Sequence, residues 1–195
     1  MELLLANLLR DRTIALAGGV RPAVGAGLGR LGARLVTLTP GEPDAAASAA
    51  RQAPVHALIY DAGTSFAEGG ADALRAAVDD GWSAIHALAT GAFIPSGQGA
   101  AIVLLAPHAD AGAHASAARA ALENTARTLS IEWARFGITT TAITPGADTG
   151  DEEIASLVAF LVSRAGAYFS GCRFELGLVG DGLLLLDPDL GLGRR

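Results

Sequence analysis

The chain alternates short, continuously apolar segments with longer segments in which apolar residues recur at helical spacing. Unbroken apolar runs are typical of strands that are covered on both faces of a parallel sheet, whereas half-exposed strands alternate apolar and polar residues. Six segments have this character and are predicted as strands: Thr13–Ala17, Arg34–Leu38, Val55–Tyr60, Ala101–Ala106, Ile138–Thr144 and Cys172–Val179.

Helical patterns lie between these runs. The apolar stripe of one helix comprises Ala118, Leu122, Ala126, Leu129 and Trp133. A second helix is predicted from about Trp82 to Ile94, after an Asp-Asp-Gly start, and a third begins near Thr149, which has capping-box spacing to Glu152. Strands alternating with helices predict a Rossmann-like, doubly wound α/β fold: a parallel sheet in a three-layer α/β/α arrangement.

One domain covering residues 1–195 is expected, because neither a repeat nor a linker divides the chain. The tail contains Leu183–Leu186, a run too apolar to remain in water, which is expected to pack on the core or on a neighbouring subunit.

Composition narrows the class of protein. Hydrophobic residues make up 51% of the chain and charged residues 17%, the mean hydropathy is +0.39, and the net charge is −6. This acidic balance, without a basic run, disfavours nucleic acid as a partner. The single cysteine, Cys172, excludes an internal disulfide and fits a reducing compartment. The first residues lack the basic region of a signal peptide, and Pro95–Gly99 interrupts the uncharged stretch Gly81–Ala109 before it could span a bilayer. A cytoplasmic protein without a membrane partner is expected.

The glycine-rich stretch after the first strand carries little sign of a cofactor site. Gly27, Gly29 and Gly32 match a G-x-G-x-x-G pattern, but they stand at the end of a predicted helix, whereas a phosphate needs the helix start. At that start, in Gly18–Val24, Pro22 has no N–H, and Arg21 is interpreted as a solvent-facing loop residue.

The order of landmarks nevertheless resembles the short-chain dehydrogenase/reductase family over nearly the whole chain. The most specific match is Ala118–Gly146, which resembles the active-site helix, the following strand and its Pro-Gly; Ala57–Gly63 resembles the strand ending in an Asn-Asn-Ala-Gly turn. The resemblance implies a Rossmann-type fold, NAD(P)-dependent carbonyl or alcohol chemistry, and dimers or tetramers. Fold alone does not give function, so each position is compared separately.

The family's four catalytic groups are missing from the corresponding positions. The resemblance places Arg119 at the family's lysine, Ala115 at its tyrosine, Ala106 or Pro107 at its serine, and Leu88 or Ala89 near its asparagine. In the turn, Tyr60 and Asp61 replace two asparagines. We therefore assign no catalytic and no cofactor-binding residue, and expect no bound cofactor.

Two segments are shorter than the family pattern. About sixteen residues separate the second strand from Val55, too few for the family's helix plus third strand. The last helix follows Pro145-Gly146 almost at once, leaving no long substrate loop. The fold is therefore expected to be a shortened version of the family's.

Other chemistry has weaker support. His114, next to the tyrosine position, could act as a substitute acid, and His108, Asp110 and His114 could ligate a metal, but their spacing matches no known site, so no metal is assigned. The acidic residues at 148 and 151–153 are ordinary for a helix start. Ser116 and Ser170 lack a nucleophile context, and Cys172 is expected to be buried.

The sequence thus leads to two main hypotheses, and to a third, a ligand or nucleotide sensor, for which the glycine turn is poor evidence. The first is a noncatalytic, reductase-like subunit that assembles with a competent reductase or dehydrogenase, or with itself. The contacts would be the helices around 82–94 and 115–136 and the C-terminal strand, since the resemblance implies that these elements form the family's interfaces. The alternative is a shortened NAD(P)-dependent oxidoreductase acting on a carbonyl or alcohol through His114 or Arg119; only this reading requires NAD or NADP.

Overall fold

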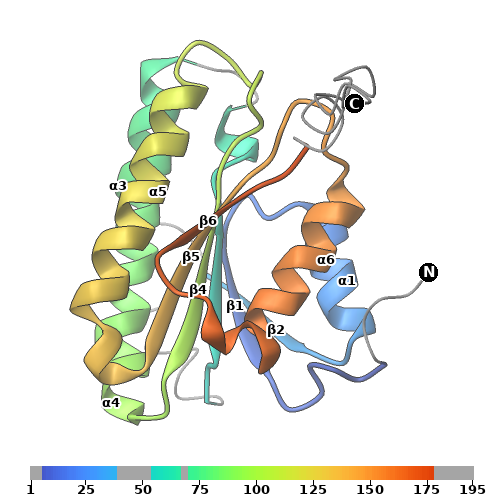
Figure 1. Cartoon of the computed structure of the whole chain (residues 1–195), viewed down its shortest axis with the longest axis vertical. Helices are drawn as coiled ribbons and strands as arrows, with labels where there is room; N and C mark the ends of the chain where they lie inside the picture. The colour runs from blue at the N-terminus through green and yellow to red at the C-terminus, as the bar shows by residue number, and fades with distance from the viewer. Residues whose placement is uncertain (1–5, 39–53, 67–69, 178–195) are drawn as a thin grey trace, which may run out of the picture.

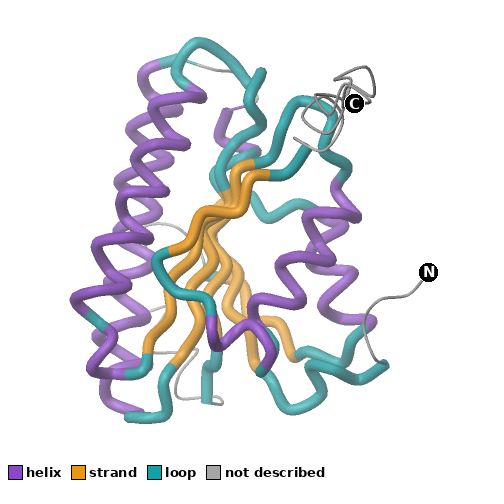
Figure 2. Tube along the Cα trace, viewed as in Figure 1, coloured by secondary structure: helices purple, strands orange, loops and turns teal. Residues whose placement is uncertain are grey.

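The structure, a computed structural model, describes residues 6–38, 54–66 and 70–177. A single parallel sheet occupies its centre, and helices cover both faces (Figures 1 and 2). The strands are β1 (Thr13–Gly18), β2 (Arg34–Thr37), β3 (Ala57–Asp61), β4 (Ala100–Leu105), β5 (Ile138–Thr144) and β6 (Cys172–Glu175). This is the predicted doubly wound α/β fold.

The helices form two layers. The main helices are α1 (Pro22–Arg30), α3 (Ala71–Leu88), α5 (Ala115–Glu132) and α6 (Asp151–Val162), with the short α4 (Ile94–Ser96) following a π-helical turn at Ala89–Phe93. Helices α3 and α5 lie side by side on one face of the sheet, and α1 and α6 lie on the other (Figure 1). No described helix is long and apolar enough to cross a membrane.

The central strands β1, β3, β4 and β5 each contribute buried side chains to two cores, because successive residues of a strand point to opposite faces. In β1, Ala15 and Ala17 belong to the core beneath α3 and α5, whereas Ile14 and Leu16 belong to the core beneath α1 and α6. Unbroken apolar strands are therefore required, and the sequence-based prediction of a sheet covered on both faces is confirmed.

The helix that contains Trp82 begins eleven residues before its predicted start, at Ala71. Gly81, interpreted from the sequence as part of a helix start, lies inside the helix and is buried. A Cβ there would come within 2.8 Å of the Tyr60 ring. This glycine therefore serves close packing of α3 on β3, and the predicted boundary was wrong.

The predicted capping box at the start of α6 is also wrong. The helix begins after Gly150, and its first turn has no side-chain cap. The hydroxyl of buried Thr149 instead accepts a hydrogen bond of 2.9 Å from the N–H of Gly146. Because that hydroxyl is turned back into the loop, it is not available to the helix.

The remaining boundaries agree closely with the predictions. Residues Pro145–Gly150 connect β5 directly to α6, which confirms the missing substrate loop. Strand β6 ends at Glu175, before the predicted end at Val179, and Val179 lies outside the described residues, as do Leu183–Leu186. Most of the shortened segment between β2 and β3, residues 39–53, also lies outside them.

Candidate functional site

The sheet order defines where a ligand would be expected. The strands are arranged β2-β1-β3-β4-β5-β6, so the direction of winding reverses between β1 and β3. Ligands of open α/β sheets bind in the crevice outside the carboxyl ends of the strands at such a switch point. In this sheet that place lies between the β1–α1 turn and the end of β3, and we call it the switch-point crevice.

A buried ion pair bridges this crevice. The Arg21 Nη1 lies 2.8 Å from Asp61 Oδ1, and the exposed fractions of the two side chains are 8% and 0%. The main-chain N–H of Arg21 donates to Asp61 Oδ2 over 3.0 Å, and the N–H of Gly63 donates to Oδ1 over 2.8 Å. The Asp61 carboxylate thus accepts hydrogen bonds from three donors. They come from the turns after β1 and β3, which would have to contact a ligand bound here. The interpretation of Arg21 as a solvent-facing residue was wrong.

The Asp61 carboxylate is a buried charge that is stabilised by Arg21 and by main-chain N–H groups. Burial raises the pKa of the Asp61 carboxyl, while the Arg21 guanidinium and the two N–H donors oppose that rise. Asp151, in the first turn of α6, places its Oδ1 3.5 Å from Arg21 Nε. The guanidinium therefore lies between two carboxylates and ties α1, β3 and α6 together.

The adjacent glycine turn is closed as well. The Thr64 hydroxyl donates to the Gly19 carbonyl over 3.0 Å, and a Cβ on Gly19 would collide with the Thr64 side chain. Gly63, in turn, lies directly against the Arg21 guanidinium. The backbone surfaces that these glycines expose are therefore occupied by side chains of the chain itself.

These contacts do not fit a dinucleotide pyrophosphate. An anion at a helix start needs free N–H donors. Here the N–H of Gly19 donates to the Asp61 carbonyl, the N–H of Arg21 donates to the Asp61 carboxylate, and Pro22 has none. Asp61 also places a negative charge where the phosphate charge would lie. Among the described residues, the donors at this helix start that could receive a phosphate are thus already used within the chain.

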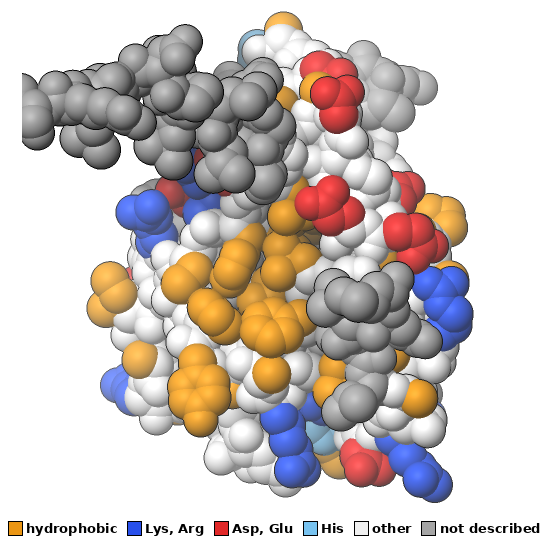
Figure 3. Space-filling model, turned by 45° about the vertical axis from the view of Figure 1, so that its right-hand side comes forward, with side chains coloured by type: hydrophobic (Ala, Val, Ile, Leu, Met, Phe, Trp, Pro, Cys, Tyr) orange, Lys and Arg blue, Asp and Glu red, His pale blue; other side chains and the backbone are white. Residues whose placement is uncertain are grey.

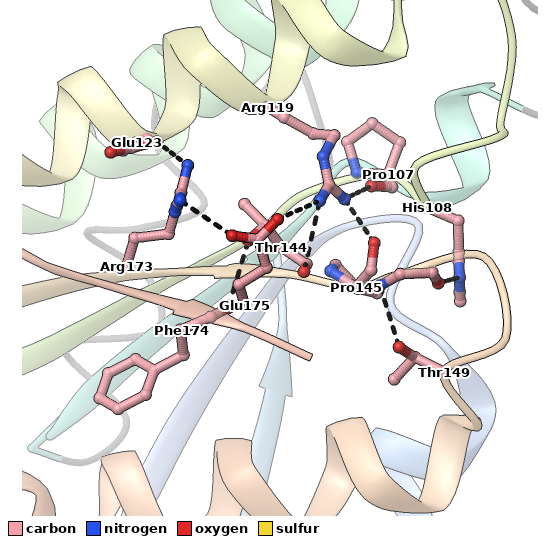
Figure 4. A network of polar contacts seen from close by, with 11 residues as sticks. Pro107, His108, Arg119, Glu123, Thr144, Pro145, Thr149, Arg173, Phe174 and Glu175 are labelled. Atoms are coloured by element: carbon pink, nitrogen blue, oxygen red, sulfur yellow. Dashed lines mark hydrogen bonds and ion pairs between the residues drawn. The ribbon is translucent and has the colours of Figure 1, made fainter. Parts of the chain in front are cut away.

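The position of the family's lysine lies farther along the same edge of the sheet, beside β4 and β5. Arg119, on α5, extends its guanidinium over the ends of both strands (Figure 4). Nη1 donates to the carbonyl of Pro107 over 3.0 Å and to the carbonyl of Pro145, and Nη2 lies 3.5 Å from the carbonyl of Thr144. The structure thus brings together the predicted lysine and serine positions.

A chain of charged residues continues from Arg119 toward the edge of the sheet. Arg119 Nη2 lies 3.9 Å from Glu175, Arg173 contacts Glu175 over 2.8 Å, and Arg173 also contacts Glu123 over 3.0 Å (Figure 4). Burial lowers the pKa of Arg119 from its usual value, but guanidinium groups remain protonated in proteins. Arg119 can bind carbonyl oxygens here; it cannot exchange protons.

The other positions implied by the resemblance carry no proton donor. Ala115 is buried in the first turn of α5. Leu88 ends α3, Ala89 begins the π-helical turn, and both are buried. The chain contains no lysine elsewhere, since its 14 basic residues are all arginines.

The alternative chemical groups are dispersed. His108 donates through Nδ1 to the Gly146 carbonyl over 2.8 Å, whereas half-buried His114 is the residue before α5 and Asp110 is exposed. Within the described ranges, no three His, Cys, Asp or Glu residues are close enough to hold a metal ion. Ser116 is exposed, Ser170 accepts from the N–H of Thr140, and Cys172 is partly exposed, not buried as predicted.

Sequence reasoning missed the Arg21–Asp61 pair. Arg21 was interpreted as a loop residue, and Asp61 as a substitution in a turn 40 residues away. A signal existed in the sequence: the two residues follow the ends of two predicted strands, and their charges are opposite.

Comparison with solved structures identifies the fold. A citronellol catabolism dehydrogenase from Pseudomonas aeruginosa PAO1 is similar with a TM-score of 0.72 and 21% identity, over 89% of this chain and 96% of that one. A Serratia marcescens short-chain dehydrogenase/reductase mutant is similar with a TM-score of 0.69 and 21% identity, over 87% of this chain and 97% of that one. A hydroxysteroid dehydrogenase from Escherichia coli has a TM-score of 0.67 and 16% identity, over 88% of this chain and 98% of that one.

Comparisons by sequence do not add to this. No protein-family profile matches the chain. No curated protein sequence matches it either. The structural matches span most of both chains at low identity, and they confirm the resemblance at the level of architecture: the protein has the fold of the short-chain dehydrogenases/reductases.

Proposed function

We propose that this protein is a noncatalytic subunit, similar to short-chain dehydrogenases/reductases, that assembles with a competent reductase or dehydrogenase or with itself. The observation that carries the proposal is the buried Arg21–Asp61 pair, which fills the switch-point crevice with the protein's own charges. A fold that satisfies this crevice internally has no need of a nucleotide to complete it.

The second half of the site supports the same conclusion. Reduction of a carbonyl requires a proton for the oxygen, and a positioned acid or base contributes about 10²–10⁴-fold to the rate. Ala115, Pro107 and Ala89 have no such proton, and the donors of Arg119 are directed at main-chain carbonyls. The helix that carries the family's chemistry is retained here as a packing element.

The proposed assembly surface is the outer face of α3 and α5. On α3, Trp82 is 48% exposed and stacks on His86 with ring centroids 5.5 Å apart, and Val78 is exposed one turn earlier. On α5, Ile131 is 80% exposed. Large apolar side chains on the outer faces of two adjacent helices are suited to a helical partner surface. The C-terminal strand β6 is the second proposed contact.

Assembly is tested with the purified chain by light scattering after gel filtration, alone and mixed with candidate reductases. We expect a dimer or a mixed complex that dissociates when Trp82→Asp is introduced. Ala26→Asp, at an exposed position of α1, is the matched control and should leave assembly unchanged. A wild-type chain that remains monomeric alone and in every mixture would contradict the proposal.

The alternative function is a shortened NAD(P)-dependent oxidoreductase with an atypical site. It is favoured by one observation: the similar solved structures described above include named dehydrogenases. Hydride transfer from NADH or NADPH to any member of a carbonyl panel, abolished by His114→Ala, would establish it. The absence of turnover, together with assembly, would favour the noncatalytic subunit.

A further inference from the structure

The amino ends of the strands carry a group of basic side chains in a protein whose net charge is −6. Arg12 directly precedes β1, Arg34 begins β2, and His56 directly precedes β3. Arg10 stands two residues before Arg12. Figure 3 shows Arg and His side chains together at the lower end of the molecule. We call Arg10, Arg12, Arg34 and His56 the basic edge.

Main-chain hydrogen bonds hold these residues beside one another. The N–H of Arg34 donates to the carbonyl of Arg12 over 2.9 Å. The N–H of His56 donates to the Thr13 carbonyl over 2.8 Å, and the N–H of Thr13 donates to Nδ1 of His56 over 3.0 Å. Strands β2, β1 and β3 are neighbours in the sheet, where adjacent strands lie about 4.8 Å apart. The spacing of the basic groups is therefore set by the sheet.

The tautomer of His56 adds a hydrogen-bond donor to this edge. Because Nδ1 accepts from the N–H of Thr13, the neutral ring carries its hydrogen on Nε2. Among the described residues Nε2 has no hydrogen-bond partner, and the side chain of His56 is half-buried. An anion at the basic edge can thus accept a hydrogen bond from the imidazole as well as from the guanidinium groups.

No carboxylate neutralises the basic edge within the described ranges. The arginines that form ion pairs there are Arg21, Arg30, Arg119, Arg127 and Arg173. Asp11, which lies between two arginines of the edge in sequence, is exposed and forms no ion pair in the same ranges. The edge is therefore a local excess of positive charge on an acidic protein.

The pKa values at this edge report the same excess. Burial and the positive charge of Arg164, which follows the end of α6, lower the pKa of Arg12. Burial and the charge of Arg12 in turn lower the pKa of His56. Cations held near one another in a partly desolvated place repel, so a negative group bound beside them lowers the energy of each.

We propose that the basic edge binds a short acidic segment of another protein through its carboxylates. Guanidinium groups and carboxylates form charge-assisted hydrogen bonds that are often bidentate. Arg34, Arg12 and His56 stand at the starts of three neighbouring strands, so their donors form a row that is wider than a single small anion. Carboxylates that recur along an extended segment can contact several members of such a row.

The range of electrostatic forces favours a short segment over a larger polyanion. At physiological ionic strength the Debye length is about 8 Å. A short acidic segment therefore interacts with the basic edge and little with the rest of the chain. A nucleic acid or an anionic membrane covers a larger area and would also meet the remainder, which carries the net negative charge. This contact is separate from the outer face of α3 and α5, and it does not rest on the proposed function.

Binding to the full chain is measured by fluorescence anisotropy with a labelled hexaglutamate peptide, and hexaglutamine is the uncharged control. We expect saturable binding of hexaglutamate that weakens as salt is raised, and no binding of hexaglutamine. Arg10→Gln combined with Arg34→Gln, both at exposed positions, should weaken binding about tenfold. Arg75→Gln is the matched control, because Arg75 is an exposed arginine of α3 that forms no ion pair in the described structure, and the affinity should be unchanged.

Three results would overturn the proposal. The first is the absence of saturable hexaglutamate binding, and the second is an equal loss of affinity in Arg75→Gln. The third is tighter binding of a single-stranded oligonucleotide or of phosphatidylserine vesicles in the same assay, which would assign the edge to another class of partner.

His56 provides a second readout that needs no variant with reduced charge. The four histidine rings of the wild-type chain are titrated by NMR with and without saturating hexaglutamate, and His56→Gln identifies the His56 signal. We expect the pKa of His56 to rise in the complex, because carboxylates bound beside the ring stabilise its protonated form. The other histidine signals should not respond to the peptide. No change at His56, or an equal response of every histidine, would contradict binding at the basic edge.

Discussion

Two arginines lie at the carboxyl edge of the sheet, and both fill positions where this fold is expected to hold a ligand. Arg21, at the switch point, is paired with a carboxylate that is itself fully buried. Arg119, beside β4 and β5, donates to neutral carbonyls of Pro107 and Pro145 and approaches Glu175 only at 3.9 Å. One region is an internal ion pair; the other is a set of hydrogen bonds to the main chain.

The difference concerns what remains when the arginine is removed. A buried charge without its partner destabilises a protein strongly, because the remaining ion must be desolvated without compensation. Neutral carbonyl oxygens that lose a donor cost less, because no ion is left to be desolvated, although Pro107 and Pro145 are themselves buried. We therefore expect the switch-point crevice to be a rigid, permanent closure and the Arg119 region to be the more tolerant of change.

The largest effect is expected from breaking the ion pair. Arg21→Ala should lower the free energy of unfolding by about 3–5 kcal/mol, since it leaves the buried Asp61 carboxylate without its guanidinium. Asp61→Ala should fall near the lower end of that range, because Arg21 keeps Asp151 at 3.5 Å. Urea denaturation at pH 7 measures this loss. The paired replacement Arg21→Met with Asp61→Leu should recover most of it. Single variants as stable as the wild type would remove the basis for a permanent closure.

Arg119→Ala should have an intermediate effect. We expect a loss of about 1–3 kcal/mol, because the substitution removes several hydrogen bonds but leaves neutral carbonyl acceptors, not an ion, without a donor. Arg119→Lys should recover less than half of the loss, since an ammonium group lacks the fork geometry that reaches carbonyls on both β4 and β5 ends. A loss as large as that of Arg21→Ala would erase the distinction between the two regions.

Thr64→Ala should have a smaller effect, below about 1 kcal/mol, because the Thr64 hydroxyl makes one exposed hydrogen bond to the Gly19 carbonyl. The same denaturation experiment applies. The variant also tests whether the Thr64 hydroxyl helps to keep a nucleotide out of the switch-point crevice. Nucleotide binding should remain undetectable in Thr64→Ala, because the Asp61 carboxylate stays in place. Binding gained by Thr64→Ala alone would mean that the hydroxyl, not the ion pair, closes the crevice.

The smallest and most specific effect on stability is expected from His56, which lies at the amino ends of β1 and β3. Nδ1 of His56 accepts a hydrogen bond of 3.0 Å from the N–H of Thr13, and burial, with the positive charge of Arg12, lowers the pKa of His56 below its usual value of 6.5. The unfolded chain therefore binds this proton at a higher pH than the folded chain does. The free energy of unfolding should therefore not change with His56 titration above pH 6.5. It should fall as the pH drops from 6.5 toward the lower pKa of His56 in the folded protein.

His56→Gln is the control, and its stability should vary less with pH across the same window. Because the residue joins β1 to β3 at their amino ends, it provides a titratable reference for the strand pair whose carboxyl ends hold Arg21 and Asp61. A wild-type protein with no loss of stability below pH 6.5 would show that His56 does not contribute in this way.

The fold was largely predictable because it follows from local patterns. Unbroken apolar runs identified the strands, and the stripe from Ala118 to Leu129 identified the buried face of α5. The start of α3 was not predictable from local rules, since Gly81 looks like a helix breaker until Tyr60 of β3 is known to pack against it. Long-range packing decided that boundary.

The sequence shows which residues stand at the family's catalytic positions, but it does not show which contacts those residues and their neighbours make. Aligning Ala115 and Arg119 with the family's catalytic positions needed the sequence alone. The burial of Arg21 did not follow from its loop position, because a loop arginine is usually exposed and its partner Asp61 is 40 residues away. The structure was required to bring the two charges together.

Titration of the wild-type chain with NADH and NADPH by calorimetry tests the central claim most directly. If Asp61 and Arg21 fill the crevice, neither nucleotide should produce binding heat at millimolar concentration, and thermal unfolding should be unchanged by either. Micromolar binding of either nucleotide would contradict the account, since it would show that the crevice opens to a cofactor, and the oxidoreductase alternative would then be favoured.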